Sequence, residues 1–245
     1  MSTSYNLIEG NDGSDFLSAV RGQADSILVF NGDDIVFGVD GGDRVVLGLG
    51  NDTLTIFGQS DPPGYSFSLD GAEIYGDGFP NSKVGSVDFP VGNDSIDISL
   101  PGRGPGVFLG ATNTLIDAGG GTDTVFGWSN ISLSTVSGGA GTDDIRWGYG
   151  ITVNGDRISS SIRNGLFEGG RGQDAVTLQA DLVSGTTIWG ASATDGAFDG
   201  DDTLIVEGYA GSDNSPINVR IDRLTLNANA GSDEIRVGNL DVNSE

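Results

Sequence analysis

Gly138-Gly139-Ala140-Gly141-Thr142-Asp143-Asp144-Ile145-Arg146 is the most informative segment of the chain, and its pattern recurs in Gly169-Gly170-Arg171-Gly172-Gln173-Asp174-Ala175-Val176-Thr177. Both stretches read G-G-x-G-x-D-x-U-x, where U is a large apolar residue. The glycines permit positive φ angles, so the chain can turn tightly, and the Asp brings a short carboxylate into the turn. The apolar residue two positions later is expected to face the interior of a short strand. The pattern therefore predicts stacked units of turn and strand.

Degenerate copies of this pattern run along the whole chain. In the N-terminal part, the aspartates at the sixth position follow one another 9 or 10 residues apart: Asp15, Asp25, Asp34, Asp43 and Asp52. Because two repeats make one coil, these spacings predict narrow coils of about 18 residues. Alternate aspartates should then share an edge, with Asp15, Asp34 and Asp52 on one and Asp25 and Asp43 on the other.

The spacing widens in the second half of the chain. The matching aspartates, 20 to 31 residues apart, are Asp94, Asp123, Asp143, Asp174, Asp202 and Asp233. Alternating apolar residues follow each of them, as in Ile145 and Trp147. We therefore expect coils of about 30 residues after residue 90, each with one Asp-Gly turn, stacked along a single edge.

These repeats resemble the RTX (hemolysin-type calcium-binding) repeat family. The resemblance implies an all-β fold, a right-handed parallel β-roll or β-solenoid. It also implies Ca²⁺ held in the Gly-Asp turns by backbone carbonyls and the eleven aspartates above, since oxygen ligands suit this hard cation. It further implies export by a type I-like route that reads an uncleaved C-terminal segment.

Composition supports carboxylates placed in turns. The chain of 245 residues has 42 glycines, and its 35 acidic residues comprise 6 Glu and therefore 29 Asp, the shorter side chain that fits a tight turn. A net charge of −24 disfavours nucleic-acid partners. The absence of Cys and His excludes thiolate and imidazole metal sites and Cys or His catalysis. No apolar run is long enough for membrane insertion, and no cleavable signal is visible.

Three regions are expected within one continuous elongated domain. They are a nonapeptide β-roll over 1–60, irregular rungs with long loops over 61–110, and a wide-coil solenoid over 111–245. The first boundary rests on Asp61-Pro62-Pro63-Gly64, which interrupts the N-terminal rhythm. Within the middle region, Asp70-Gly71-Ala72-Glu73-Ile74-Tyr75-Gly76 still resembles a rung.

The sequence favours a secreted calcium-binding structural protein that associates head to tail into an extracellular filament, sheath or surface layer. A monomeric adhesion module that binds a polysaccharide is the first alternative, with Trp128, Trp147 and Trp189 as a sugar platform or as core residues. A carbohydrate-active β-helix enzyme is the second alternative, with Arg157, Arg163 or Arg171 as a base. No motif places these arginines against acids, so we expect no catalytic residues and no cofactor other than Ca²⁺.

Overall fold

The computed structural model describes residues 4–56, 68–77, 92–98, 110–127, 130–148, 152–153, 156–157, 160–191, 200–208 and 219–238. These residues form β-strands, turns and bends. The prediction of an all-β protein with long parallel sheets, as in a parallel β-solenoid, is confirmed. No helix in the described ranges is long and apolar enough to cross a membrane.

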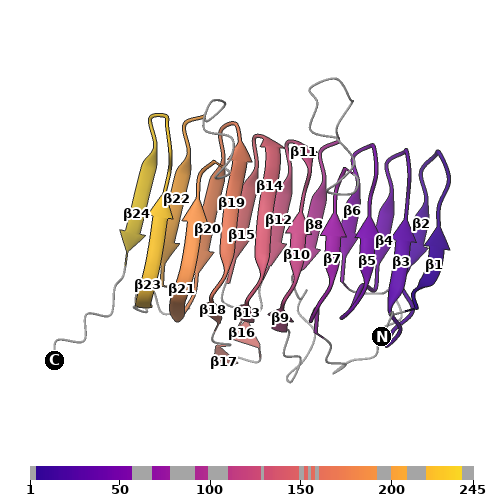
Figure 1. Ribbon diagram of the computed structural model, residues 1–245, viewed down its shortest axis with the longest axis horizontal. Helices are drawn as coiled ribbons and strands as arrows, with labels where there is room; N and C mark the ends of the chain where they lie inside the picture. The colour runs from indigo at the N-terminus through magenta and orange to yellow at the C-terminus, as the bar shows by residue number, and fades with distance from the viewer. Residues whose placement is uncertain are drawn as a thin grey trace.

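Two long sheets stack their strands along the axis of an elongated molecule (Figure 1). The second sheet, at the back in this view, has nine parallel strands. In spatial order they are β2 (Phe16–Ser18), β4 (Ile35–Phe37), β6 (Thr53–Thr55), β8 (Ser95–Ile98), β12 (Thr124–Gly127), β15 (Asp144–Trp147), β20 (Ala175–Gln179), β22 (Thr203–Glu207) and β24 (Glu234–Gly238). Chain order and spatial order agree, as expected when each coil is laid on the one before.

The first sheet has thirteen strands and faces the viewer in Figure 1. Its main column consists of β1 (Asn6–Glu9), β3 (Asp25–Leu28), β5 (Arg44–Val46), β7 (Glu73–Tyr75), β10 (Leu115–Asp117), β14 (Thr135–Gly141), β19 (Leu166–Arg171), β21 (Leu182–Trp189) and β23 (Arg220–Asn227). The short β11 (Gly120–Gly121) pairs with β14.

A second column of the first sheet is formed by β9 (Gly110–Thr112), β13 (Asn130–Ser132) and β18 (Ser161–Arg163). It joins the main column through β21, whose first residues pair with β18 and whose last residues pair with β19. This side column begins at Leu69, whose N–H donates to the carbonyl of Gly110. The N-terminal coils therefore have two walls, and the coils from Leu69 onward have three.

Both sheets continue across the middle of the chain. Strand β7 pairs with β5 and β10, and β8 pairs with β6 and β12. The segment Asp70 to Gly76, which resembles a rung in the sequence, contains β7. One antiparallel pair, β16 (Thr152–Val153) with β17 (Asp156–Arg157), is found beside the parallel strands.

The core lies between the walls and consists of inward rows, one side chain per coil. One row, with all members fully buried, is Ile27, Val45, Ile74, Ile116, Val136, Phe167 and Ile188. Trp147 is also fully buried and packs edge-on against Phe167, with ring centroids 6.2 Å apart. Its partner residue in β12 is Gly127, where a Cβ would lie 2.5 Å from the indole ring. The indole ring of Trp147 therefore occupies space that is free because Gly127, in the adjacent coil, has no side chain.

Candidate functional site: an aspartate ladder with unpaired oxygens

Nine aspartates form a continuous hydrogen-bonded row where the first sheet turns into the second. In each pair, the backbone N–H of one Asp donates to Oδ1 of the Asp in the next coil, over 2.6–3.0 Å. We call this row the aspartate ladder; its members are Asp15, Asp34, Asp52, Asp94, Asp123, Asp143, Asp174, Asp202 and Asp233. The turns that carry it run along the upper side of the molecule in Figure 1, which we call the ladder edge.

The glycines of the repeat make this arrangement possible. The carboxylate of Asp143 folds back into its own turn, so that a Cβ on Gly138 would lie 2.5 Å from Oδ2 of Asp143. Gly141 has a φ of 143° and stacks on the carbonyl of Gly121 in the preceding coil, where no side chain fits. The turn therefore closes around the carboxylate and excludes water from it.

Closure leaves one oxygen of five inner aspartates without a hydrogen-bond partner. The Oδ2 atom is buried and accepts no hydrogen bond in Asp34, Asp52, Asp94, Asp123 and Asp143. Each of these residues is at most 2 % exposed, so water does not replace the missing donor. A buried carboxylate oxygen without a hydrogen bond is costly, because it has given up water and gained nothing in return. These five oxygens therefore call for a proton or a cation.

Burial shifts the protonation of these groups. It raises the pKa of Asp52 to about 7, of Asp94 to about 9, of Asp123 to about 8 and of Asp143 to about 7. Backbone N–H donors oppose this rise, and negative neighbours add to it. Near neutral pH these four carboxyl groups are thus poised between a protonated and an ionised state, because desolvation disfavours the charge that a bound cation would favour.

At the opposite edge of the N-terminal coils, the two aspartates of the repeat have hydrogen-bond donors for both carboxylate oxygens. Asp25 accepts from Nδ2 of Asn6 and the N–H of Val20, and Asp43 accepts from the N–H groups of Asp25 and Asp40. Both carboxylates have their two oxygens hydrogen-bonded, so they stabilise their turns without another partner.

Hydroxyl side chains occupy the same edge in the coils from Leu69 onward. The N–H of Thr114 donates to Oγ of Ser134 over 3.1 Å, and both side chains are buried. The opposite edge therefore changes from carboxylates to neutral acceptors along the chain, whereas the ladder edge keeps one carboxylate in every coil.

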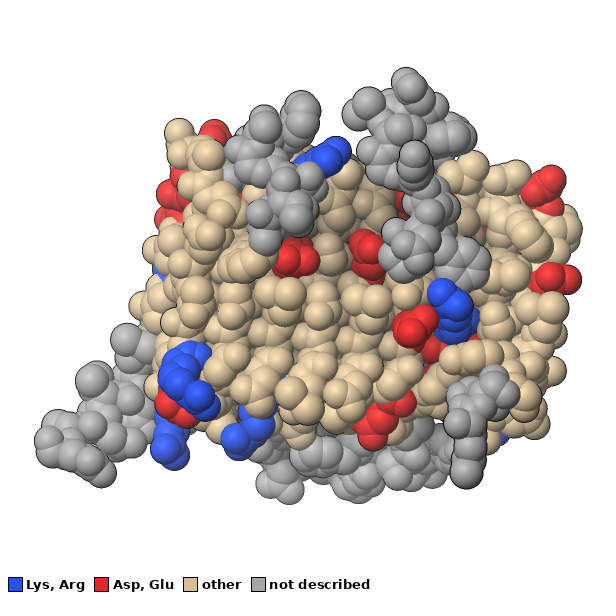
Figure 2. Space-filling model, viewed as in Figure 1, with Lys and Arg blue, Asp and Glu red and all other residues tan. Residues whose placement is uncertain are grey.

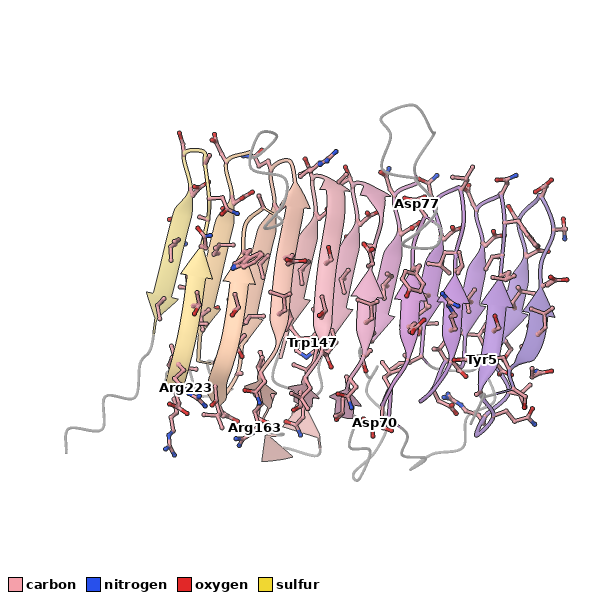
Figure 3. The ribbon with its side chains drawn as sticks, in the orientation of Figure 1. Tyr5, Asp70, Asp77, Trp147, Arg163 and Arg223 are labelled. Atoms are coloured by element: carbon pink, nitrogen blue, oxygen red, sulfur yellow. The ribbon has the colours of Figure 1, made fainter. Side chains whose placement is uncertain are left out.

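Two further acids lie near the ladder and were missed by the sequence reasoning: Asp77, which is buried, and Asp117, which is half-buried. Asp77 accepts from the N–H of Gly120 over 2.7 Å and of Gly92 over 3.3 Å, and its charge raises the pKa of Asp94 further. Burial also raises the pKa of Asp117. Figure 3 shows Asp77 at the ladder edge and the exposed Asp70 at the opposite edge. The Gly76-Asp77-Gly78 triplet is the signal that could have identified the first of them.

The donor chemistry of the ladder fits a hard cation. All the side-chain atoms involved are carboxylate oxygens, and the stacked turns bring backbone carbonyls close to them. Within the described ranges, no group of three or more acidic side chains has the spacing of a metal site. A cation at the ladder would therefore be held by one or two carboxylates together with main-chain carbonyls. Asp34, Asp52, Asp94, Asp123 and Asp143 are the residues best placed to hold it.

The structure also places the other residues singled out in the sequence. Trp147 is in the core, so the idea of a sugar platform is wrong for this residue, while Trp189 is half-buried in β21 and Trp128 lies outside the described residues. Arg163 is exposed at the edge opposite the ladder (Figure 3). Arg171 is half-buried, and the side chain of Arg157 is outside what the structure describes.

Comparison of the chain with models of protein families, with curated proteins and with solved structures finds no match in any of the three.

Proposed function

We propose that the chain is a calcium-binding structural protein of the RTX type, exported from the cell and assembled end to end into a filament, sheath or surface layer. In this proposal the coils form a right-handed β-roll, with narrow coils of about 18 residues followed by wider coils of about 30. Ca²⁺ bound in the Gly-Asp turns replaces the protons that the ladder otherwise requires.

The row of unpaired Oδ2 atoms is the single observation that carries this proposal. Five nearly inaccessible carboxylates, from Asp34 to Asp143, each retain one oxygen without a hydrogen bond. Hydrogen bonds satisfy both oxygens of Asp25 and Asp43, so unpaired oxygens are not a general property of aspartates in these turns. A divalent cation, when bound, would supply the positive charge and the direct oxygen contacts that the ladder lacks.

Strand pairing at the two ends supports assembly. Within the described residues, β1 and β2 pair on one side only, and so do β23 and β24. Inward side chains are exposed there, with Ile235 at 48 % and Val237 at 39 %, whereas their partners Leu204 and Val206 in β22 are fully buried. An unpaired strand edge beside an exposed apolar core is a site for strand addition.

Export in an unfolded state is consistent with the charge. A net charge of −24 opposes compaction when no cation is bound. Extracellular calcium modules bind weakly, with Kd values of roughly 10⁻⁴–10⁻³ M. The chain would therefore stay open in the cell and fold outside it.

Microscopy and light scattering of the purified protein test the proposal. We expect filaments or sheets in millimolar Ca²⁺ and none in chelator. The double change Ile235→Lys and Val237→Lys places charges on the inward side of β24 and should leave folded monomers. A matched control, Glu234→Lys with Arg236→Lys, puts lysines on the outward side of the same strand and should still assemble. A wild type that remains monomeric in Ca²⁺ at high protein concentration contradicts the structural role.

A polysaccharide-binding module is the second candidate, and a surface groove favours it. This open groove of about 490 Å³ lies where the ladder edge meets the second sheet. Its polar lining includes Thr122, Thr142, Gln173, Asp201 and Thr203. Hydroxyl, amide and carboxylate groups in adjacent coils could bind the hydroxyls of a glycan chain. Glycan-array binding by a monomer, lost in Thr142→Ala with Gln173→Ala, would establish this function instead.

A further inference from the structure

The aspartate ladder has a direction, and this direction specifies how two copies can meet. Each internal aspartate donates its N–H toward the C-terminal end and offers Oδ1 toward the N-terminal end. At the last coil, Asp233 receives the N–H of Asp202, while its own N–H has no partner among the described residues. At the first coil, the one donor to Oδ1 of Asp15 among the described residues is the side-chain amide of Asn11. At the C-terminal end the N–H of Asp233 therefore lacks an acceptor within the described part of the chain, and at the N-terminal end Oδ1 of Asp15 can accept a second hydrogen bond.

We propose that a second copy of this chain docks so that the ladder continues across the junction, with the N–H of Asp233 donating to Oδ1 of Asp15 in the next copy. This inference rests on the proposed end-to-end assembly and specifies its register. The internal register, extended by one coil, places β1 of the next copy beside β23 and β2 beside β24. Leu226 then covers Ile8, and Ile235 covers Leu17, which continues two core rows.

The sequence of β23 matches this partner. The N-terminal coil has two walls, so it can pair with the part of β23 in the main column but not with the part in the side column. The pairing half, Leu224 to Asn227, is uncharged, whereas the other half, Arg220 to Arg223, has three charged residues in four. Charged residues are a common means of protecting a strand edge that remains unpaired. The chain already stacks a three-walled coil on a two-walled one where β7 pairs with β5.

Charge also favours contact between unlike ends. Residues 220–238 hold three of the ten arginines and three acids, Asp222, Asp233 and Glu234, so this coil is neutral. Residues 4–22, a range of the same length, hold three acids, Glu9, Asp12 and Asp15, and one base, Arg21, so this coil has a net negative charge. Figure 2 shows both basic and acidic side chains at the C-terminal end on the left, and acidic side chains at the N-terminal end on the right. Two N-terminal ends would repel each other, while a neutral end can approach an acidic one.

Cysteine cross-linking tests the register, because the chain has no cysteine of its own. In the proposed junction Leu7 is the neighbour of Thr225, and both are exposed. Their Cα atoms would be about 4.8 Å apart, the spacing of neighbouring strands and within disulfide range. Leu7→Cys and Thr225→Cys proteins, one of them carrying a size tag, are mixed in Ca²⁺ and oxidised mildly.

We expect a mixed disulfide-linked dimer, formed at least tenfold faster than with Asn227→Cys in place of Thr225→Cys. Asn227 is also exposed but lies one pleat further along β23, about 8 Å from Leu7 across the junction. Filaments without the mixed dimer, or with Leu7→Cys homodimers, overturn the register and leave the structural role standing. The absence of both filaments and cross-links overturns the two together.

Discussion

The backbone N–H of Asp52 donates a 2.9 Å hydrogen bond to Oδ1 of Asp94, although the two residues are 42 positions apart in the sequence. This bond joins the N-terminal coils to the later ones without interrupting the ladder. In this row Oδ1 always accepts a hydrogen bond, and Oδ2 is buried in every member between Asp15 and Asp233. The stability of the fold should therefore depend on pH and on bound cations.

We predict that, without calcium, the protein is most stable in mild acid. In the folded state, burial raises the pKa values of Asp52, Asp94, Asp123 and Asp143 from the ordinary 3.8 of an aspartate to about 7 to 9. A carboxyl group whose pKa is higher in the folded than in the unfolded protein favours the folded state when it is protonated. This contribution is complete below the pKa of the unfolded state and is lost as the pH rises through the pKa of the folded state. In chelator the melting temperature should therefore fall between pH 4 and pH 9. A melting temperature that rises over this range would contradict the presence of buried Oδ2 atoms without a hydrogen bond.

We predict opposite effects of Asp94→Asn in the two conditions. Asn keeps an oxygen for the N–H of Asp52 but carries no charge, so in chelator at pH 8 it should stabilise the fold by about 1–3 kcal/mol, the scale of a buried polar group's desolvation. In millimolar Ca²⁺ it should reduce the stabilisation by the cation. Urea unfolding in both conditions measures the difference. The exposed Asp70→Asn serves as the control and should change neither value by more than about 0.5 kcal/mol.

The sequence predicts much of this fold, because each repeat combines a local turn signal with a strand in which apolar and polar residues alternate. The apolar residues that follow each turn, such as Ile96, Val125 and Val176, are buried as the alternation predicts. The side column was not predicted, because its short strands lack the Gly-Asp signal and are specified by contacts with neighbouring coils, as for Leu69 with Gly110.

The candidate site was predictable only in part. The spacing identifies the aspartates, but it does not reveal which of their oxygens are already hydrogen-bonded. The partners of Asp25 and Asp43 at the opposite edge include backbone N–H groups, which leave no trace in a residue pattern. Asp117 lies outside any Gly-Asp turn motif, and its burial depends on the packing of separate coils.

We predict that Leu133→Asn stabilises the protein by about 1 kcal/mol. Leu133 has a φ of 53°, a left-handed conformation that costs a leucine about 1–2 kcal/mol and suits asparagine. In the neighbouring coil the equivalent residue is Asn164, which adopts this conformation with a φ of 49°. Leu7→Asn is a matched control, since Leu7 and Leu133 are both 57 % exposed and Leu7 lies in a regular strand. Equal effects of the two changes on the urea midpoint would argue against a backbone origin.

We predict that Gly127→Ala destabilises the fold by about 1–3 kcal/mol through overpacking against Trp147. The loss should shrink when Trp147→Leu is also present, because the two sites share one space. Gly110→Ala is the control, as a Cβ there meets no atom within 4 Å. Additive losses in the double variant would show that the two residues do not compete for volume.

Calcium titration at pH 7.5, followed by far-ultraviolet circular dichroism and calorimetry, measures directly whether the aspartate ladder binds Ca²⁺. We expect β structure to increase and heat to be exchanged as Ca²⁺ approaches the millimolar range, and chelator to reverse both changes. A spectrum that is the same in chelator and in millimolar Ca²⁺, with no heat of binding, would contradict the claim that the aspartate ladder is a calcium site.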